Sequence, residues 1–396
     1  MKVLMINSVC GTGSTGRICT DLADCLMTNG NECRIAYGRG ISPQKYLPYS
    51  YRIGRDFDIK IHGIMTRLSD KHGFYSKKAT KKLVEWIKCY NPDVIHLHNL
   101  HGYYINIEIL FEYLKTCGKK IFWTLHDCWA FTGHCAHYSA KKCYQWKTAC
   151  KVCNCLRDYP KCYLKGNVYF NYMTKQNLFC GINNLKIITP SNWLCEQVKM
   201  SFLKNYKTVV IPNGIDLNTF SHTNEDFFRE YHRKNIKILL GVASVWSKNK
   251  GIEDFNQLAN FLDKSYKVVL VGIDEDSKIN IDNKILCLPH CEKTEILAKI
   301  YSSADLVINP SVEETMGMTT LEAIACGTPA IVYNCTALPE VIDSLSGIVV
   351  EPGVENILNA LDMALKIDKT DCIKRAGLFS LEHQYNKYID MYYGKN

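Results

Sequence analysis

Short apolar runs alternate with longer amphipathic segments along most of the chain. Apolar runs of roughly four to eight residues bounded by turn residues are typical of buried strands, and the segments between them are typical of helices that cover a sheet. The alternation predicts an α/β fold with two doubly wound parallel sheets. The predicted strands are 3–8, 32–37, 94–98, 120–125, 186–189 and 208–211, then 237–242, 267–271, 284–287, 306–308, 330–333 and 347–350.

A charged segment with few apolar residues, 217–235, separates the two halves of this pattern and is the predicted linker. The chain has 396 residues, which exceeds the size at which a single hydrophobic core stops growing. We therefore expect one domain over 1–216, a second over 236–377, and a closing amphipathic helix within 378–396.

Composition indicates a globular protein, with 47% hydrophobic and 22% charged residues. The first apolar run, 3–9, is short and leads directly into glycines, so it does not resemble a cleaved signal or a membrane span. We expect a cytoplasmic location. The chain has 20 cysteines, and in a reducing compartment these would be free thiols or metal ligands rather than a disulfide framework.

The net charge is +9, and part of it gathers between Lys71 and Lys82. The amphipathic helix predicted over 81–90 has two interpretations. It lies on an anionic membrane surface, which would make the protein peripheral on the inner face of the cell membrane. Alternatively, it covers a sheet and exposes a basic face to solvent.

Two carboxylates, Glu314 and Glu322, flank a turn at Gly317 that opens a predicted helix. A helix start presents free N–H groups and the positive end of the helix dipole, so it can bind a diphosphate. Glu322 can accept hydrogen bonds from a ribose diol. The alternative is structural, because Thr319 to Glu322 also fits a capping box in which the glutamate binds an N–H of its own helix.

A second glycine-rich turn, Gly11 to Gly16, follows the first predicted strand and matches the fingerprint Gly-x-Gly-x-x-Gly. An NAD site would need an acidic residue after the second strand, but that strand leads to Arg39. Arg39 could hold the phosphate of NADP instead. An NADP-dependent oxidoreductase is thus one alternative function, although it leaves the Glu314 region unexplained.

Several motifs in order resemble the retaining glycosyltransferases of family 4, which have the GT-B fold. The Glu-x7-Glu motif is followed by Ala323 to Pro329, and the chain also has the glycine turn, Leu125-His126-Asp127, the segment 211–216 and Lys250-Gly251. The resemblance implies two Rossmann-like domains facing across a cleft, an acceptor domain followed by a donor domain, and a C-terminal helix that crosses back to the first. It also implies a nucleotide-sugar donor and no metal in catalysis.

The resemblance assigns roles to particular residues. His126, Glu314 and Lys250 would be catalytic, with Lys250 neutralising charge on the leaving diphosphate. An arginine of the family is replaced here by Ser244, and Lys248 would supply the missing charge. The donor would contact Gly13, Gly16, Lys248, Lys250, Glu314, Met316, Gly317, Met318, Thr319 and Glu322, and the acceptor side would comprise His98, Asn99, His101 and Asp127.

A cysteine-rich insert over 128–162 follows His126 and is expected to shape the acceptor side. The insert is polar, and its sequence suggests few apolar residues that could form a core. Four cysteine thiolates in a tetrahedral arrangement suit a structural zinc ion, which would hold such a segment in its fold. We predict ligation by Cys135, Cys143, Cys150 and Cys153. An iron–sulfur cluster or unligated thiols are the alternatives. Competing ligands are Cys128, Cys155, Cys162, His134 and His137.

The proposed activity is therefore hexosyl transfer with retention, from a UDP- or GDP-sugar to a glycan or lipid-linked acceptor. By resemblance it would serve bacterial surface polysaccharide biosynthesis. A zinc-containing nucleic-acid-binding protein is an alternative from another class, suggested by the basic charge and the insert. It would need aromatic residues interleaved with a basic stripe. The second half has no such stripe, so we expect no nucleic-acid partner.

Overall fold

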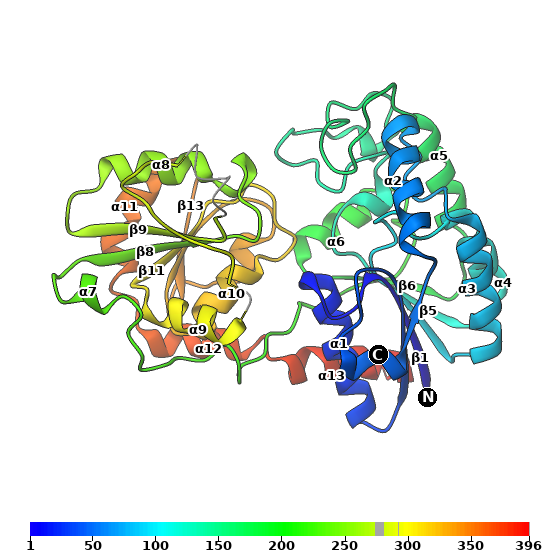
Figure 1. Ribbon diagram of the computed structural model, residues 1–396, viewed down its shortest axis with the longest axis horizontal. Helices are drawn as coiled ribbons and strands as arrows, with labels where there is room; N and C mark the ends of the chain where they lie inside the picture. The colour runs from blue at the N-terminus through cyan, green and yellow to red at the C-terminus, as the bar shows by residue number, and fades with distance from the viewer. Residues whose placement is uncertain (274–280, 292, 396) are drawn as a thin grey trace. The chain divides into compact units, whose positions relative to one another are not determined.

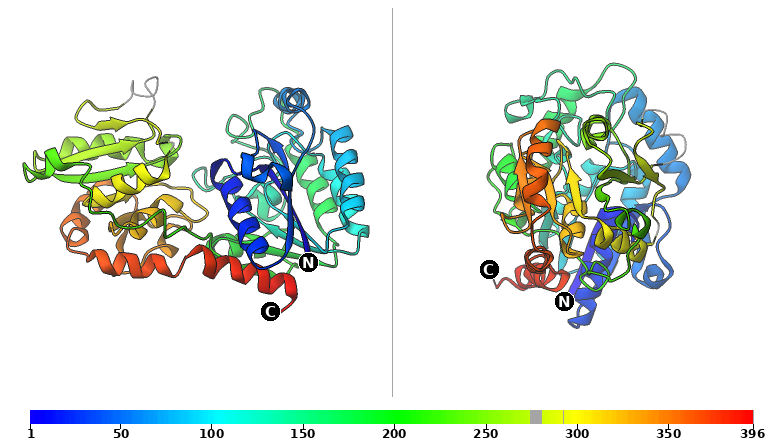
Figure 2. Two further views of the ribbon diagram at one scale, coloured as in Figure 1. Left: turned by 60° about the horizontal axis from the view of Figure 1, so that its bottom comes forward. Right: turned by 90° about the vertical axis from the view of Figure 1, so that its left-hand side faces the viewer.

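The computed structural model describes residues 1–273, 281–291 and 293–395. The chain divides into two compact units, Met1–Pro212 with Tyr385–Asn396, and Asn213–Gln384. Each unit is a parallel sheet with helices packed against it (Figures 1 and 2).

The first unit has a seven-stranded sheet in the order β3-β2-β1-β4-β5-β6-β7, and all of its recorded strand pairs are parallel. Its strands are β1 (Lys2–Val9), β2 (Glu32–Arg39), β3 (Ser50–Arg52), β4 (Val94–Leu97), β5 (Lys120–Thr124), β6 (Leu185–Thr189) and β7 (Thr208–Val210). Its helices are α1 (Gly13–Thr28), α2 (Asp56–Ser69), α3 (Lys77–Tyr90), α4 (Ile107–Thr116), α5 (Val168–Phe179), α6 (Asn192–Lys199) and most of α13 (Leu381–Tyr393).

The second unit has a six-stranded parallel sheet in the order β10-β9-β8-β11-β12-β13. Its strands are β8 (Lys237–Val242), β9 (Tyr266–Val271), β10 (Leu286–Leu288), β11 (Leu306–Asn309), β12 (Ala330–Tyr333) and β13 (Gly347–Val350). Its helices are α7 (Arg229–His232), α8 (Ile252–Phe261), α9 (Thr294–Ser303), α10 (Met318–Ala325), α11 (Val354–Ala364) and α12 (Lys369–Gly377).

Both sheets have the strand order of a doubly wound fold, which confirms the predicted fold class. In each sheet the direction of winding reverses between two neighbouring strands, β1 and β4 in the first unit and β8 and β11 in the second. Ligands of open α/β sheets bind outside the carboxyl ends of the strands at such a reversal. The loops after these four strands are therefore where the topology favours a site.

The strands are apolar on both faces because helices cover both sides of the sheet. In the second unit Leu240 and Val269 belong to one buried cluster, whereas their neighbours Leu239 and Leu270 belong to another. All twelve predicted strands are present to within a few residues. The structure adds β3, which is only three residues long and only partly buried, so its sequence has no distinct apolar run.

Helix α3 covers the sheet of the first unit, which is the second interpretation of the basic helix predicted over 81–90. Leu83 and Ile87 are fully buried, and the indole of Trp86 stacks on the ring of Tyr51 with their centroids 4.4 Å apart. Its apolar face is therefore occupied by the protein's own core, and the membrane interpretation of this helix is not supported.

Helix α13 packs its tyrosines against strands β4 and β5 of the first sheet. The hydroxyl of Tyr392 is 2.5 Å from Nδ1 of His96, and Thr124 Oγ1 donates to the hydroxyl of Tyr388 at 3.4 Å. The Nζ of Lys120 donates to the carbonyl of Tyr392 at 3.0 Å, at the last turn of the helix, where a cation stabilises free carbonyls. These bonds join the end of the chain to β4 and β5.

Candidate active site

Two loops meet at the reversal of the second sheet, one following β8 and one following β11. The N–H of Val312 donates to the carbonyl of Asn249 at 3.0 Å, and Asn249 Nδ2 donates to Glu313 Oε2 at 2.9 Å. Gly251 has φ of +75°, and a Cβ there would lie 2.3 Å from Cγ of Pro310. The two loops can approach this closely only because position 251 has no side chain.

Lys250 and Glu314, one from each loop, form an ion pair between Nζ and Oε1. Their side chains are 33% and 19% exposed, so the pair faces solvent from a partly enclosed position. Lys248 lies elsewhere: its Nζ is 3.1 Å from Oε2 of Glu253 on α8, and its side chain is 78% exposed. The structure therefore brings Lys250, and not Lys248, to the acidic loop.

The start of α10 lies directly after this loop. Gly317 has φ of +85°, a conformation that favours glycine, and a Cβ there would lie 2.6 Å from the side chain of Leu338. Helix α10 has no side-chain cap. Within the described part of the chain, no acceptor is recorded for the N–H groups of Met318 and Thr319, which begin the helix. These donors and the helix dipole make the position suitable for an anion.

Glu322 lies one turn further along α10 and is 8% exposed. Tyr301 on α9 donates its hydroxyl hydrogen to Glu322 Oε2 at 3.0 Å. Burial, followed by the nearby Glu322 carboxylate, raises the pKa of the Tyr301 hydroxyl, so it stays protonated as a donor. The capping-box alternative is wrong, because the residue that caps the helix is Gly317 and no side-chain cap is formed.

Met316 precedes the glycine turn and is 4% exposed. Its sulfur lies 3.0 Å from the backbone nitrogen of Asn213, so it packs inside the second unit. Its side chain therefore helps to fix the loop, and only its backbone could contact a ligand without rearrangement.

At the reversal of the first sheet, the glycine turn between β1 and α1 is tightly folded. The N–H of Gly11 donates to the carbonyl of Gly16 at 3.1 Å, and a Cβ at Gly16 would lie 3.0 Å from Val9. Gly13 has φ of +64° with open space beside it. Helix α1 begins there with no side-chain cap and no acidic residue in its first turn. This turn is a second helix start suited to an anion.

His126 follows β5, and its ring Nε2 is 3.0 Å from Nδ1 of His98, which follows β4. The two rings are stacked, 5.3 Å apart. Burial lowers the pKa of His126 to about 4, although the charge of Asp127 opposes this change. His126 is therefore a neutral imidazole near pH 7, able to hydrogen-bond but not to supply positive charge.

Asp127 and His101 form the second pair of this region. Their Oδ2 and Nε2 atoms are 2.7 Å apart. Burial alone would raise the pKa of Asp127, but the charge and the hydrogen bond of His101 outweigh burial and lower it to about 2. The carboxylate is therefore ionised at neutral pH. The predicted acceptor-side residues lie together with His126 around one small cavity of about 10 Å³: His98, Asn99, His101 and Asp127.

Two residues of this region were not predicted. The hydroxyl of Tyr159, from the insert, is 3.0 Å from Nδ1 of His101 and extends the pair to three members. Lys175 is buried on α5, where it donates to the carbonyls of Trp129 and Thr132 at 2.8 and 3.1 Å. Burial lowers the pKa of Lys175 to about 7. Neither residue belongs to a sequence motif, because both reach the site only through tertiary folding.

The predicted zinc site at Cys135, Cys143, Cys150 and Cys153 is not supported. Within the residues that the structure describes, no group of three or more His, Cys, Asp or Glu side chains is placed to hold a metal ion. The cysteines are free thiols, and Cys135 forms hydrogen bonds with Cys153 and Cys155 instead.

The physical reason is that apolar residues of the insert join the hydrophobic core of the first unit. Trp129, Phe131, Tyr138 and Trp146 are all at most 2% exposed, and the rings of Phe131 and Tyr138 each lie 5.0 Å from that of Trp146. Cys143 and Cys153 pack against this core as small hydrophobic residues. The expectation that the segment has little to fold around was therefore wrong.

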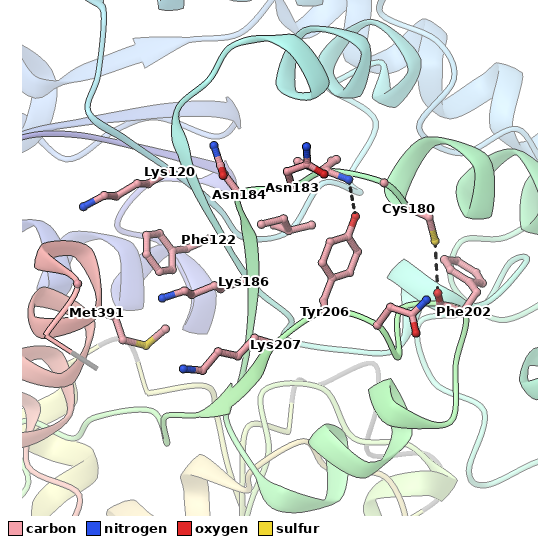
Figure 3. A pocket seen from close by; sticks show the side chains of 15 residues that line it. Lys120, Phe122, Cys180, Asn183, Asn184, Lys186, Phe202, Tyr206, Lys207 and Met391 are labelled. Carbon is pink, nitrogen blue, oxygen red and sulfur yellow. Dashed lines mark hydrogen bonds between the residues drawn. The ribbon is translucent and has the colours of Figure 1, made fainter.

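A larger hollow of about 620 Å³ lies at the opposite, amino edge of the first sheet (Figure 3). Lys120, Lys186 and Lys207 line it from three neighbouring strands or their starts, and Met391 of α13 lies beside them. None of the predicted site residues lines this hollow. Its size alone therefore does not mark it as the active site, because the reversal points lie at the other edge of the sheet.

Comparisons with known proteins agree with the fold and its motifs. Residues 15–219 match the family model described as Glycosyltransferase Family 4, and residues 236–366 match the model described as Glycosyl transferases group 1. A relative from Escherichia coli K12, described as a putative colanic acid biosynthesis glycosyl transferase, WcaC, is 22% identical over 364 residues, covering 88% of this chain and 86% of its own.

Solved structures show the same fold. Sucrose-phosphate synthase from Thermosynechococcus elongatus has a TM-score of 0.71 at 17% identity, covering 100% of this chain and 98% of its own. Anabaena Alr3699/HepE, solved in complex with UDP, has a TM-score of 0.67 at 13% identity, with both chains covered completely.

The fold and the matched models thus define a glycosyltransferase with the GT-B fold. The chain belongs to glycosyltransferase family 4. Membership in this family favours sugar transfer over the oxidoreductase and nucleic-acid-binding alternatives. In the part of the chain that the structure describes, no helix is both long and apolar enough to cross a membrane.

Proposed function

We propose that this protein transfers a hexose from a nucleoside diphosphate sugar to a glycan or lipid-linked glycan, with retention of anomeric configuration, in surface polysaccharide biosynthesis. The observation that carries the proposal is the pairing of Lys250 with Glu314 beside the start of α10, at the reversal of the second sheet. The E. coli relative described as a colanic acid transferase supports the pathway class, and the UDP complex of the Anabaena protein supports the donor class.

The donor diphosphate is proposed to bind at the start of α10. There the N–H groups of Met318 and Thr319 would donate to phosphate oxygens, and Lys250 would offset the negative charge that grows as the sugar leaves. The carboxylate of Glu314 would stabilise the positive charge that develops at the anomeric carbon. Glu322 would accept hydrogen bonds from the ribose, in addition to the bond it receives from Tyr301.

The acceptor is proposed to bind to the first unit beside His101 and Asp127. The ionised carboxylate keeps a proton on His101 Nε2, because a carboxylate at 2.7 Å can only accept. Nδ1 of His101 lies 3.0 Å from the hydroxyl of Tyr159 and would orient that hydroxyl toward an incoming sugar. His126 is proposed to contact the donor sugar through its neutral ring or its carbonyl oxygen.

The first test is a thermal-shift screen of the purified protein against UDP-, GDP- and ADP-sugars, with NADPH in the same panel. A ligand that binds only the folded state raises its melting temperature. We expect one nucleotide sugar to raise it and NADPH to leave it unchanged. The reverse result would favour the oxidoreductase alternative.

The second test uses the donor identified in that screen. Its anomeric proton and that of the product are followed by NMR during turnover, and retention predicts the same configuration in both. A Glu314→Ala variant that turns over at the wild-type rate would refute the role of this carboxylate. Because Lys250 and the helix start supply positive charge at the diphosphate, we expect activity to persist in excess EDTA.

A further inference from the structure

Helix α2 exposes apolar side chains where a surface helix normally exposes polar ones. Its buried positions are His62, Gly63 and Thr66, and Ile59 is an apolar residue of the helix that packs against the core. Five large hydrophobic residues face outward instead and share one side of the helix by their spacing. Their exposed fractions are 70% for Phe57, 42% for Ile61, 55% for Ile64, 37% for Met65 and 49% for Leu68.

This surface continues beyond the end of α2. The N–H of Tyr163 donates to the carbonyl of Arg67 at 2.8 Å, and Asn167 Nδ2 donates to the carbonyl of Ser69 at 2.6 Å, so the segment 163–170 is held against the last turn. Tyr163 is 52% exposed and Leu164 is 59% exposed. We call the α2 face the set Phe57, Ile61, Ile64, Met65, Leu68, Tyr163 and Leu164.

Basic residues are exposed on α2 and the adjoining segment, namely Lys60, Arg67, Lys161 and Lys165. The guanidinium of Arg67 lies 6.0 Å from the ring centroid of Tyr103, so the basic border of the α2 face consists of the three lysines. The acidic residues of α2 both lie in its first turn, where Asp56 pairs with Arg52 and Asp58 accepts from the N–H of Arg55. The apolar surface is therefore bordered by positive charge at its far end, and tyrosine is among its members.

We propose that the α2 face docks on the surface of a phospholipid bilayer that contains anionic lipid. Apolar side chains with a lysine border, and a tyrosine at the edge, are the features that bind the boundary between headgroups and acyl chains. A contiguous exposed apolar surface on a folded protein marks an interaction site. A second copy of the chain fits less well, because pairing two α2 faces would bring their basic borders together.

The inner side of the same helix connects this surface to the acceptor region of the first unit. The ring of His62 lies 6.0 Å from that of Tyr103, and Tyr103 lies 6.2 Å from Tyr159, which bonds to His101. Docking of the α2 face would therefore hold the acceptor region close to a lipid-linked substrate. Only this consequence rests on the proposed function; the docking itself does not.

The test is co-sedimentation of the full chain with vesicles of phosphatidylcholine mixed with phosphatidylglycerol, and with vesicles of phosphatidylcholine alone. We expect binding to the anionic vesicles that weakens as salt rises. The double variant Ile61→Ser with Ile64→Ser should bind at least about tenfold more weakly, because each exposed isoleucine loses several buried carbon groups. A matched control is Ile296→Ser with Ile373→Ser, two isoleucines of similar exposure on α9 and α12, which should bind like the wild type.

Charge is tested in the same way. Lys161→Ala with Lys165→Ala should weaken binding to anionic vesicles roughly tenfold or more, since each basic residue near such a surface contributes about fivefold. Lys186→Ala with Lys207→Ala removes the same charge from the hollow of Figure 3 and should have a smaller effect. The reverse order of these two variants would overturn the assignment of the surface.

Three further results would overturn the proposal. The first is that the wild-type protein does not bind anionic vesicles at low salt. The second is that the double isoleucine variant binds these vesicles like the wild type. The third is that light scattering finds the wild type to be a dimer, and the double isoleucine variant to be a monomer that still binds the vesicles. Donor hydrolysis measured beside each binding assay separates the two proposals. If hydrolysis is absent in the wild type but vesicle binding follows the expected order, the proposed function fails and the α2 face remains.

Discussion

Replacing Lys250 with alanine removes one partner of the ion pair beside the start of α10 and leaves the carboxylate of Glu314 facing the proposed diphosphate. The side chain of Lys250 is one-third exposed, so the effective dielectric is intermediate and a charged hydrogen bond is worth about 1.5–3 kcal/mol. We therefore expect the dissociation constant of UDP or GDP to rise roughly 10- to 150-fold.

The effect on turnover should exceed the effect on binding. Negative charge on the diphosphate grows as the bond to the sugar breaks, and loss of one group aimed at such developing charge typically lowers kcat by about 10²–10³. Binding is measured by isothermal titration of the nucleotide, and turnover by release of the nucleotide from the sugar donor. Lys250→Arg keeps the charge and should recover part of both.

Lys299→Ala is the matched control for this variant. Lys299 lies on α9 of the same unit and pairs with Glu225 at 2.7 Å, where both side chains are exposed. An exposed pair of this kind is worth about 0–1 kcal/mol, so neither binding nor turnover should change by more than a few-fold. If Lys250→Ala binds the nucleotide and turns over like Lys299→Ala, the electrostatic account of this loop is wrong.

Three other predictions follow from particular contacts. Glu322→Gln should weaken UDP binding by about tenfold or more while leaving the affinity for inorganic diphosphate unchanged, because the proposed contact is to the ribose; equal losses in titrations of both ligands would contradict this role. Gly251→Ala should lower the melting temperature by several degrees in calorimetry. The alanine would have to adopt a left-handed backbone conformation, at a cost of about 1–2 kcal/mol, and its Cβ would clash with Pro310. An unchanged melting temperature would show that the two loops are not packed as described. His126 has a folded pKa of about 4, below the unfolded value of about 6.5, so the stability it contributes is complete above pH 6.5 and is lost as the pH falls toward 4. Urea unfolding at several pH values across that range should show a smaller loss of unfolding free energy for His126→Asn than for the wild type. An equal dependence of that free energy on pH in both proteins would refute the neutral state of the ring.

The sequence was sufficient to predict most of the fold because buried parallel strands are nearly continuous apolar runs. Strands such as β8 and β12 have the predicted bounds, since their flanking residues change abruptly from apolar to polar. The turn at Gly317 was also predictable, because a glycine before a helix in an α/β sequence indicates a left-handed position. β3 was missed because three partly buried residues produce no pattern.

The residues of the site were only partly predictable. Lys250 and Glu314 could be assigned from their motifs, but their ion pair depends on β8 and β11 being neighbours in the sheet, which sequence spacing does not reveal. Tyr159 reaches His101 from the insert, 58 positions away, and no local feature marks it. The prediction for the insert was wrong because its cysteines stand out in the sequence, whereas the burial of Trp129 and Trp146 in the core of the first unit depends on tertiary folding.

The α2 face shows a different limit of sequence patterns. An apolar spacing of this kind normally indicates the side of a helix that faces the core. In α2 the inner side is mixed. Ile59 packs against the core, whereas His62 hydrogen-bonds with Ser76 and Gly73. Spacing alone therefore does not show whether the core of the protein or a partner surface covers an apolar stripe of this kind.

The most direct test of the account is a crystal structure of the protein with UDP or GDP, whichever nucleotide raises the melting temperature more. We predict that its diphosphate contacts the N–H groups of Met318 and Thr319 and the Nζ of Lys250, with the ribose against Glu322. A nucleotide bound instead at the glycine turn between β1 and α1, with its phosphates away from α10, would contradict the assignment of the second unit as the donor site.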